Sequence, residues 1–194
     1  MRYPAIYSYL AKAIDYPAAD FRQLVIDCGS ALSAHFPEAA ARYQPFREFV
    51  AGAEEARLEE AYTATFDVNA VCHLDVGYQL FGEDYKRGAL LVELSRVQRE
   101  AGNDTGTELA DYLPNLLRAV PKVTRTEERE ELVRKLMLPA IEKMVASFPE
   151  GSANVYRQAL ETIAGVLEQD FGSAVPFPVH VDYSAEIAEG GTYV

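Results

Sequence analysis

The chain offers few of the residue groups that enzymes use for chemistry. Only three histidines and two cysteines occur in 194 residues. His73 follows Cys72 directly, and adjacent residues on a helix point about 100° apart, so the two cannot readily share one metal ion. No CxxC, ExxH, HExxH, GxxxxGK[ST], GxGxxG or GxSxG pattern is present. We therefore expect neither an enzyme nor a bound metal or other cofactor.

Aromatic, acidic and glycine residues are instead concentrated in one central region. Residues 58–88 read LEEAYTATFDVNAVCHLDVGYQLFGEDYKRG, and ELADYLP follows at 108–114. Tyr62 and Phe66 are four residues apart and share one face at the end of a helix. Asp67, next in sequence, is expected to cap the following element. This composition is typical of either an ordinary helix junction or a binding surface.

Two further residues of this region have predicted structural roles. Gly77 allows a neighbouring helix or backbone to approach closely, because it has no side chain. Arg87 is expected to pair with an acid across the junction, with Glu83, Asp75 and Asp67 as the candidates.

The excess of acidic over basic residues lies in two segments of the chain. The net charge is −12, with 30 acidic and 18 basic residues. Residues 52–83 hold seven acids and only Arg57 as a base, and residues 158–194 hold six acids and no base. The simplest interpretation is solvated helix faces, and the alternative is electrostatic guidance of a cationic ligand. The charge repels a phosphate backbone, so we expect no nucleic acid partner.

Helical periodicity must position these residues, because strand-like alternation is nearly absent. Apolar residues recur at spacings of three and four, and proline, glycine and serine stand at the expected helix ends. The expected helices cover residues 4–15, 17–35, 38–51, 53–66, 84–101, 132–148 and 152–171. Pro139 is expected to bend the helix over 132–148, and Ser152 to open the last helix. The pattern predicts an all-α, single-domain helical bundle over residues 1–172.

The C-terminal end, residues 173–194, has a different pattern. In VPFPVHVDY, apolar residues alternate with proline and polar residues, which disfavours a helix and favours an extended, acidic arm. Two roles are open for it: a strap across the helical body, or a segment that covers or competes for a binding groove.

The remaining expectations concern location. No apolar run approaches the roughly 18 residues that a bilayer span requires, so we expect no integral membrane protein. The N-terminal sequence lacks a signal-peptide pattern, and two cysteines cannot form a disulfide framework. We expect a cytoplasmic protein.

Three sequence blocks resemble those of a known family. YTATFD, the Y-x-LFGE-x-x-KRG block at 78–88 and EL-x-DYLP at 108–114 are similar to the nitrate reductase delta-subunit (NarJ) family, within the TorD-like chaperones that assemble molybdenum enzymes. The resemblance covers about residues 1–170, with its specific motifs at 58–118, and does not extend to the tail. It implies an all-helical, non-enzymatic chaperone.

The resemblance also implies a partner and a set of contact residues. Such chaperones bind the N-terminal segment of an apo molybdopterin-containing catalytic subunit and hold it for molybdenum cofactor insertion and complex assembly. A monomer is expected, with a dimer formed by exchange of elements as the alternative. The residues expected to contact the partner are Tyr62, Phe66, Asp67, His73, Asp75, Tyr78, Phe81, Glu83, Arg87, Asp111, Tyr112 and Pro114.

Other functions remain open on the sequence alone. Relatives of the nitrate-reductase chaperones serve dimethyl-sulfoxide, selenate, chlorate and hydrocarbon-oxidising enzymes, so the client is not identified. A generic acidic helical adaptor would bind a basic protein surface without preferring an N-terminal leader. An enzyme or nucleotide-binding protein without a recognisable motif is a third alternative.

Overall fold

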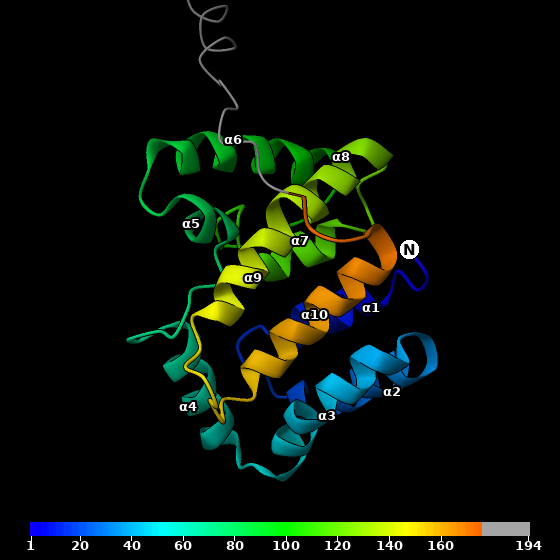
Figure 1. Cartoon of the computed structure of the whole chain (residues 1–194), viewed down its shortest axis with the longest axis vertical. Helices are drawn as coiled ribbons and strands as arrows, with labels where there is room; N and C mark the ends of the chain where they lie inside the picture. Colours follow the sequence, from blue (N-terminus) through cyan, green and yellow to red (C-terminus); the bar gives the residue numbers. More distant parts are fainter. Residues whose placement is uncertain (176–194) are drawn as a thin grey trace, which may run out of the picture.

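The computed structural model describes residues 1–175, and these form an all-α domain (Figure 1). Their only β-type pairing is an isolated antiparallel bridge between Asp75 and Tyr112. Of the predicted tail over 173–194, residues 176–194 lie outside the described part. The helices are α1 (Ile6–Ala13), α2 (Phe21–His35), α3 (Pro37–Gly52), α4 (Glu55–Phe66), α5 (Val76–Phe81), α6 (Tyr85–Glu100), α7 (Leu113–Ala119), α8 (Thr126–Glu131), a π-helical stretch η1 (Leu132–Met137), α9 (Leu138–Ala146) and α10 (Tyr156–Phe171).

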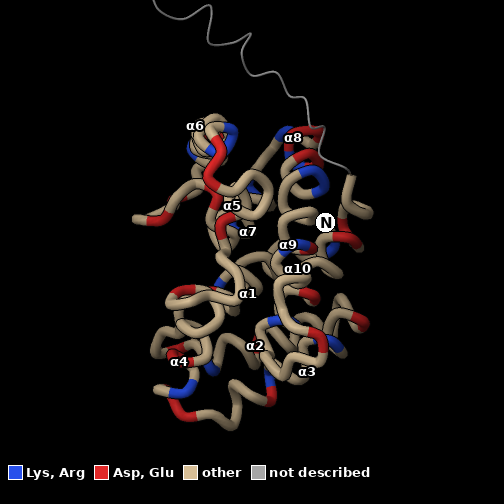
Figure 2. The backbone as a smooth tube through the Cα atoms, turned by 60° about the vertical axis from the view of Figure 1, so that its left-hand side comes forward, with Lys and Arg blue, Asp and Glu red and all other residues tan. Residues whose placement is uncertain are grey.

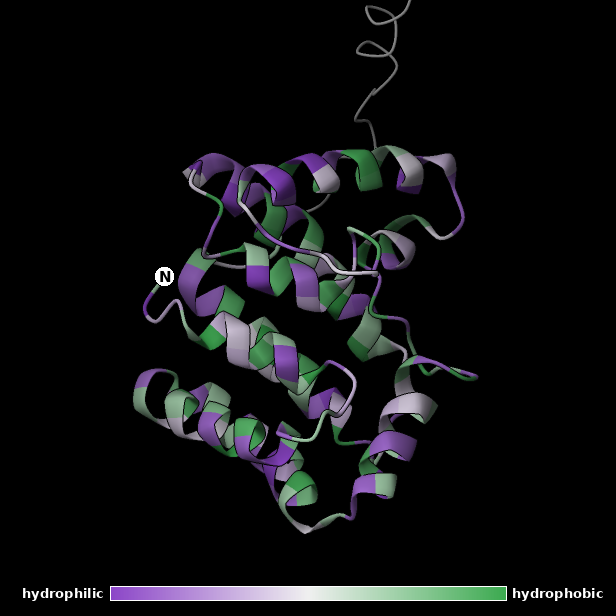
Figure 3. Ribbon diagram, turned by 180° about the vertical axis from the view of Figure 1, so that it is seen from behind, coloured by the Kyte–Doolittle hydropathy of each residue, from purple (hydrophilic) through white to green (hydrophobic). Residues whose placement is uncertain are grey.

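Helix α10 is central to the packing. It lies against α3 on one side and α9 on the other, while α1 packs against α2 and α7. In Figure 1, α2, α3 and α4 occupy one end of the long axis and α6 the other. Hydrophobic and hydrophilic residues alternate along the helices (Figure 3), as expected for helices that bury one face. Acidic and basic segments intermingle on α6 and α8 (Figure 2).

An aromatic cluster joins α3, α4 and α10 in the core. Tyr156 is 1% exposed, and its ring centroid lies 5.2 Å from that of Phe46 and 4.9 Å from that of Phe66. Tyr62 is 5.3 Å from Phe66 and 6.1 Å from Tyr156. These tilted and edge-on contacts are favourable beyond the area that they bury. The end of α4 is thus held by rings from helices far away in sequence.

Several predicted helix ends are confirmed and others differ. Pro37 stands in the first turn of α3, and α10 ends at Gly172, whose φ is 84°. The second helix begins at Phe21 rather than 17, after a turn closed by a hydrogen bond from the Phe21 amide to the Ala18 carbonyl. Asn154, not Ser152, accepts the amide of Tyr156 at the start of α10, with a distance of 3.0 Å.

The predicted helix over 132–148 belongs to a longer helical run. α8, η1 and α9 follow one another without a break from 126 to 146. Proline has no amide hydrogen and crowds the carbonyl four residues earlier, which removes one regular α-helical bond at Pro139. The chain accommodates this with the π-helical stretch η1, which precedes Pro139, so the helix continues.

No helix among residues 1–175 combines the length and the apolar character needed to cross a membrane.

Candidate functional site

Arg87 joins two of the predicted motif blocks at the junction of α5, α6 and α7. Its Nε donates to Asp111 Oδ2 at 2.9 Å, and its Nη2 lies 3.2 Å from Asp75 Oδ1. The Asp111 side chain is completely buried, whereas those of Arg87 and Asp75 are 21% and 29% exposed. The predicted Arg87–Asp75 pair is confirmed. Asp111 was not expected as a partner, and no pair of Arg87 with Asp67 or Glu83 forms.

Backbone bonds and a glycine make this close approach possible. The amide of Val76 donates to the Asp111 carbonyl at 2.8 Å, and the amide of Leu113 donates to the Leu74 carbonyl at 2.9 Å. A Cβ on Gly77 would lie 2.8 Å from Asp111 Oδ2, which is closer than real Cβ contacts. The predicted role of Gly77 in close packing is therefore confirmed.

One aromatic candidate, Tyr78, lies over the Arg87 side chain, and a second, His73, packs against Tyr78. The Arg87 guanidinium carbon lies 5.6 Å from the ring centroid of Tyr78, within the range of a cation–π contact. The exposed His73 ring meets Tyr78 edge-on, with the centroids 5.3 Å apart. The structure thus brings together His73, Asp75, Tyr78, Arg87 and Asp111, which we call the arginine junction.

The two carboxylates of the arginine junction affect how the free energy of unfolding depends on pH. Burial and then the nearby Asp111 carboxylate raise the pKa of Asp75, and these outweigh the lowering by Arg87. Folded protein therefore binds a proton at Asp75 more readily than unfolded protein, and this contribution to stability is lost as pH rises through the folded pKa.

The free energy of unfolding of Asp75→Asn should accordingly lie within about 1 kcal/mol of the wild-type value at pH 7, because the Arg87–Asp75 pair is partly exposed. As pH falls through the folded pKa of Asp75, the wild type should gain stability relative to the variant. Urea denaturation of both proteins from pH 7 to pH 4 measures the difference. If the wild type instead lost stability relative to Asp75→Asn as pH falls, the raised pKa of Asp75 would be contradicted.

A second polar network surrounds Tyr112, the residue that follows Asp111. The Tyr112 hydroxyl is 3.1 Å from the Tyr62 hydroxyl and donates to Asp15 Oδ1 at 3.1 Å. Arg118 Nη1 pairs with Asp15 Oδ2 at 3.2 Å. Burial raises the pKa of Tyr62 to about 12 and also raises the pKa of Tyr112, so both phenols stay protonated at neutral pH. The predicted residues Tyr62 and Tyr112 therefore lie together.

Exposed aromatic surface and unpaired acids adjoin this network. Tyr16 is 52% exposed, and its ring stands edge-on to Tyr62 with the centroids 5.4 Å apart. Asp67 and Glu108 are both exposed and close enough to Tyr62 to raise its pKa. Neither carboxylate has an ion pair with any residue of 1–175. We call Tyr16, Tyr62, Tyr112, Asp67 and Glu108 the tyrosine face.

The remaining predicted contact residues are not gathered at one surface. Phe66 is 6% exposed within the aromatic cluster, and Pro114 is buried in the first turn of α7. Phe81 is half-buried against the core at the end of α5, and Glu83 is exposed just beyond it. Asp67 follows the last residue of α4, and the next helix, α5, has Asp75 rather than Asp67 at its N-cap position, so the predicted capping role of Asp67 is wrong.

Sequence reasoning missed four residues that complete the tyrosine face and its support. Asp15 and Tyr16 directly follow the first helix, and Arg118 lies in α7. They are distant in sequence from Tyr62, and no spacing rule links them to it. Glu108 is the first residue of the ELADYLP block but was not among the predicted contact residues. Pro17, which keeps the chain non-helical here, was the available signal for Asp15 and Tyr16.

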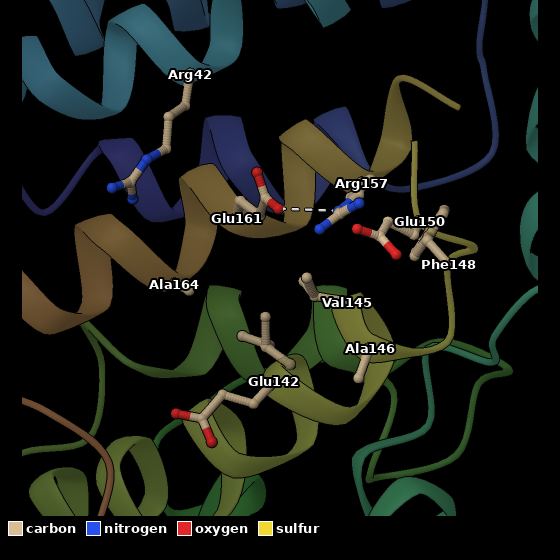
Figure 4. A pocket seen from close by; sticks show the side chains of 10 residues that line it. Arg42, Glu142, Val145, Ala146, Phe148, Glu150, Arg157, Glu161 and Ala164 are labelled. Atoms are coloured by element: carbon tan, nitrogen blue, oxygen red, sulfur yellow. Dashed lines mark hydrogen bonds and ion pairs between the residues drawn. The ribbon is translucent and has the colours of Figure 1, made fainter. Parts of the chain in front are cut away.

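A cleft of about 800 Å³ lies elsewhere, between α9 and α10 (Figure 4). Its apolar side chains come mainly from α9 and the loop after it, including Val145 and Phe148. Arg157 and Glu161 of α10 form an ion pair at its edge, with Nε 3.0 Å from Oε1. None of the predicted contact residues lines this cleft. The sequence therefore predicted neither its place nor its lining.

Within residues 1–175, no group of three or more histidine, cysteine, aspartate or glutamate side chains is arranged to hold a metal ion. No model of a known protein family matches the chain, and no curated protein matches it either.

Proposed function

We propose that this protein is a chaperone that binds a basic N-terminal segment of an apo molybdopterin-containing catalytic subunit, and that the tyrosine face receives that segment. One observation carries the proposal. The exposed ring of Tyr16 packs edge-on against Tyr62, and the pKa of Tyr62 is raised by Asp67 and Glu108, two exposed carboxylates that have no ion pair within residues 1–175. Two of the sequence blocks that resemble the NarJ family, YTATFD and ELADYLP, contribute residues to this face.

The chemistry of the tyrosine face suits an arginine-bearing polypeptide. A guanidinium can lie against a tyrosine ring and pair with a carboxylate at the same time. Tyrosine contributes a large contact area with few rotatable bonds, which makes it a common anchor at interfaces. The network of Asp15, Arg118 and Tyr112 holds Tyr62 beneath Tyr16, so the surface is organised before a ligand arrives.

The free energies of burial and of association indicate a moderate affinity, with most of the binding free energy from apolar contact. A peptide face that buries about 600 Å² of apolar surface yields roughly 15 kcal/mol before costs, at about 25 cal/mol per Å². Association costs of about 4–15 kcal/mol leave room for micromolar binding, near −8 kcal/mol. Exposed ion pairs add only about 0–1 kcal/mol each, so the carboxylates govern selectivity and association rate. Such an affinity suits a client that must be released.

Charge reversal at the tyrosine face tests the proposed site. The double variant Asp67→Lys/Glu108→Lys should bind a leader peptide roughly tenfold more weakly, because two attractions become repulsions of about 1 kcal/mol or less each. Helical circular dichroism should be unchanged, since both side chains are exposed. Isothermal titration with the same peptide measures the loss.

Glu142→Lys is the matched control, because Glu142 is an exposed acid that lines the α9–α10 cleft, away from the tyrosine face. Its affinity should equal that of the wild type. Loss of binding in Glu142→Lys together with full binding in the double variant would move the leader site to the cleft and overturn the tyrosine face as the site.

A further inference from the structure

Helix α6 carries the two most exposed large hydrophobic side chains of residues 1–175. Tyr85 is 81% exposed and Val92 is 73% exposed. Seven residues are close to two helical turns, so these two side chains lie on the same, outer face of α6. The opposite face, with Leu90, Leu94 and Val97, is buried in the domain. Figure 1 shows α6 at one end of the long axis of the molecule.

Gly88 also lies on the outer face of α6, three residues after Tyr85 and four before Val92. Packing within the described domain does not require a glycine there. A Cβ at Gly88 would meet no atom within 4 Å, and its φ is not positive. Glycine inside a helix is less stable than alanine, but it lets a second helix approach closely. Gly88 therefore suits a contact with a molecule outside the domain.

The outer face is complementary to itself when two copies of α6 pair antiparallel. Val92 is seven residues from both Tyr85 and Arg99, so a two-fold axis at Val92 places Tyr85 of each copy opposite Arg99 of the other. Arg99 is exposed and has no ion pair with any residue of 1–175. Its guanidinium can lie against the tyrosine ring as a cation–π contact. Gly88 and Ser95 of the two copies then face each other, so the backbones can approach closely.

The charges of α6 also suit a second copy of the chain. Residues 85–100 hold four bases, Lys86, Arg87, Arg96 and Arg99, and two acids, Glu93 and Glu100. The acid-rich segments 52–83 and 158–194 lie outside α6, so the paired helices present no excess of acids to each other. Lys86 has no ion pair within residues 1–175. The same two-fold axis brings it within roughly 3 Å, along the helix, of Glu100 of the other copy.

We infer that two copies of this chain associate through the outer faces of α6, antiparallel about a two-fold axis at Val92. No exchange of elements is needed, because α6 keeps its own buried face. The 16 residues of α6 span about 24 Å, and one such helix pair buries less than the roughly 800 Å² per partner of a typical stable complex. The association is therefore weak, and dilute protein is monomeric. It is separate from the proposed leader site, because no residue of the tyrosine face lies in α6.

Cysteine cross-linking of the full-length chain tests this geometry. Val92→Cys places one thiol of each copy at the two-fold axis, so this variant should link to itself. Tyr85→Cys should not, because its two copies lie about 21 Å apart along the helices. An equimolar mixture of Tyr85→Cys and Arg99→Cys should link, because these positions face each other. Ser30→Cys is the matched control, because Ser30 is exposed within α2, at the other end of the molecule (Figure 1).

The native thiols of Cys28 and Cys72 are buried, and burial raises the pKa of each to about 12, so they react little. Under oxidised glutathione, Val92→Cys should form a disulfide-linked dimer at least about tenfold faster than Ser30→Cys, because the contact raises the local concentration of the thiol. A rate equal to that of Ser30→Cys would overturn the inference. Self-linking of Tyr85→Cys as fast as that of Val92→Cys would indicate parallel pairing and overturn it as well.

A charge at the axis tests the same contact without cross-linking. Val92→Glu places two carboxylates opposite each other, one from each copy, and should weaken self-association at least about tenfold. Sedimentation velocity of both proteins over a range of concentrations measures the change. Circular dichroism should be unchanged, because Val92 is exposed. Equal association of the two proteins, or a wild type that stays monomeric at its highest soluble concentration, would contradict the inferred dimer.

Discussion

Arg87→Met is expected to lower the free energy of unfolding by about 3–5 kcal/mol, because it leaves the Asp111 carboxylate buried without a cation. Asp111 is 0% exposed, and Arg87 donates to it through Nε at 2.9 Å. Methionine is unbranched, replaces the aliphatic part of the arginine side chain and has no charge, so the lost interaction is mainly that of the guanidinium with the carboxylates. Urea denaturation followed by circular dichroism measures the effect.

Two controls separate the buried ion pair from the loss of any arginine. Arg57→Met removes a cation whose side chain is 58% exposed in its pair with Glu60, and should change stability by less than about 1 kcal/mol. Adding Asp111→Asn to Arg87→Met should recover at least about 1 kcal/mol, because the buried charge disappears. A double variant that is less stable than Arg87→Met would show that the carboxylate is not the source of the cost.

Tyr156→Ala is expected to cost a similar 3–5 kcal/mol, because it opens a cavity at the centre of the aromatic cluster. The Tyr156 ring is within 5.2 Å of Phe46 and 4.9 Å of Phe66, measured between centroids. Thermal and urea unfolding both report the loss. The Tyr62 side chain should also become less well held, since its ring packs against Tyr156.

Tyr156→Phe is the control for this prediction. It keeps the ring and its contacts, and should stay within about 1 kcal/mol of the wild type. If Tyr156→Phe were as unstable as Tyr156→Ala, the hydroxyl rather than the ring contacts would be the stabilising element.

Local sequence patterns predicted most of the helices, because apolar spacing and terminal proline or glycine act within a few residues. The structure confirms the all-α fold and the first-turn position of Pro37. The structure differs from the prediction at two places where a proline was expected to begin or bend a helix. Phe21 begins a helix expected from residue 17, and η1 continues a helical run through Pro139.

The candidate site was only partly predictable, because it depends on contacts between distant segments. The sequence offered several acids as partners for Arg87, but its buried partner is Asp111. Backbone hydrogen bonds between residues 74–76 and 111–113 bring Asp111 close to Arg87. Tyr16 meets Tyr62 where the Tyr112 hydroxyl lies within hydrogen-bond distance of both Tyr62 and Asp15, residues far apart in sequence. Residues such as Phe66 have the chemistry of an interface anchor but serve the core, and composition alone does not separate these roles.

Isothermal titration of the full-length protein with N-terminal peptides of molybdenum-enzyme catalytic subunits, at low and high salt, tests the central claim most directly. The account predicts micromolar binding to one such peptide. Salt should weaken this binding without abolishing it, because apolar contact supplies most of the energy and carboxylates supply the rest. Failure of every leader peptide to bind, with capture of a basic protein through a surface other than an N-terminal segment, would contradict the account and favour an acidic helical adaptor.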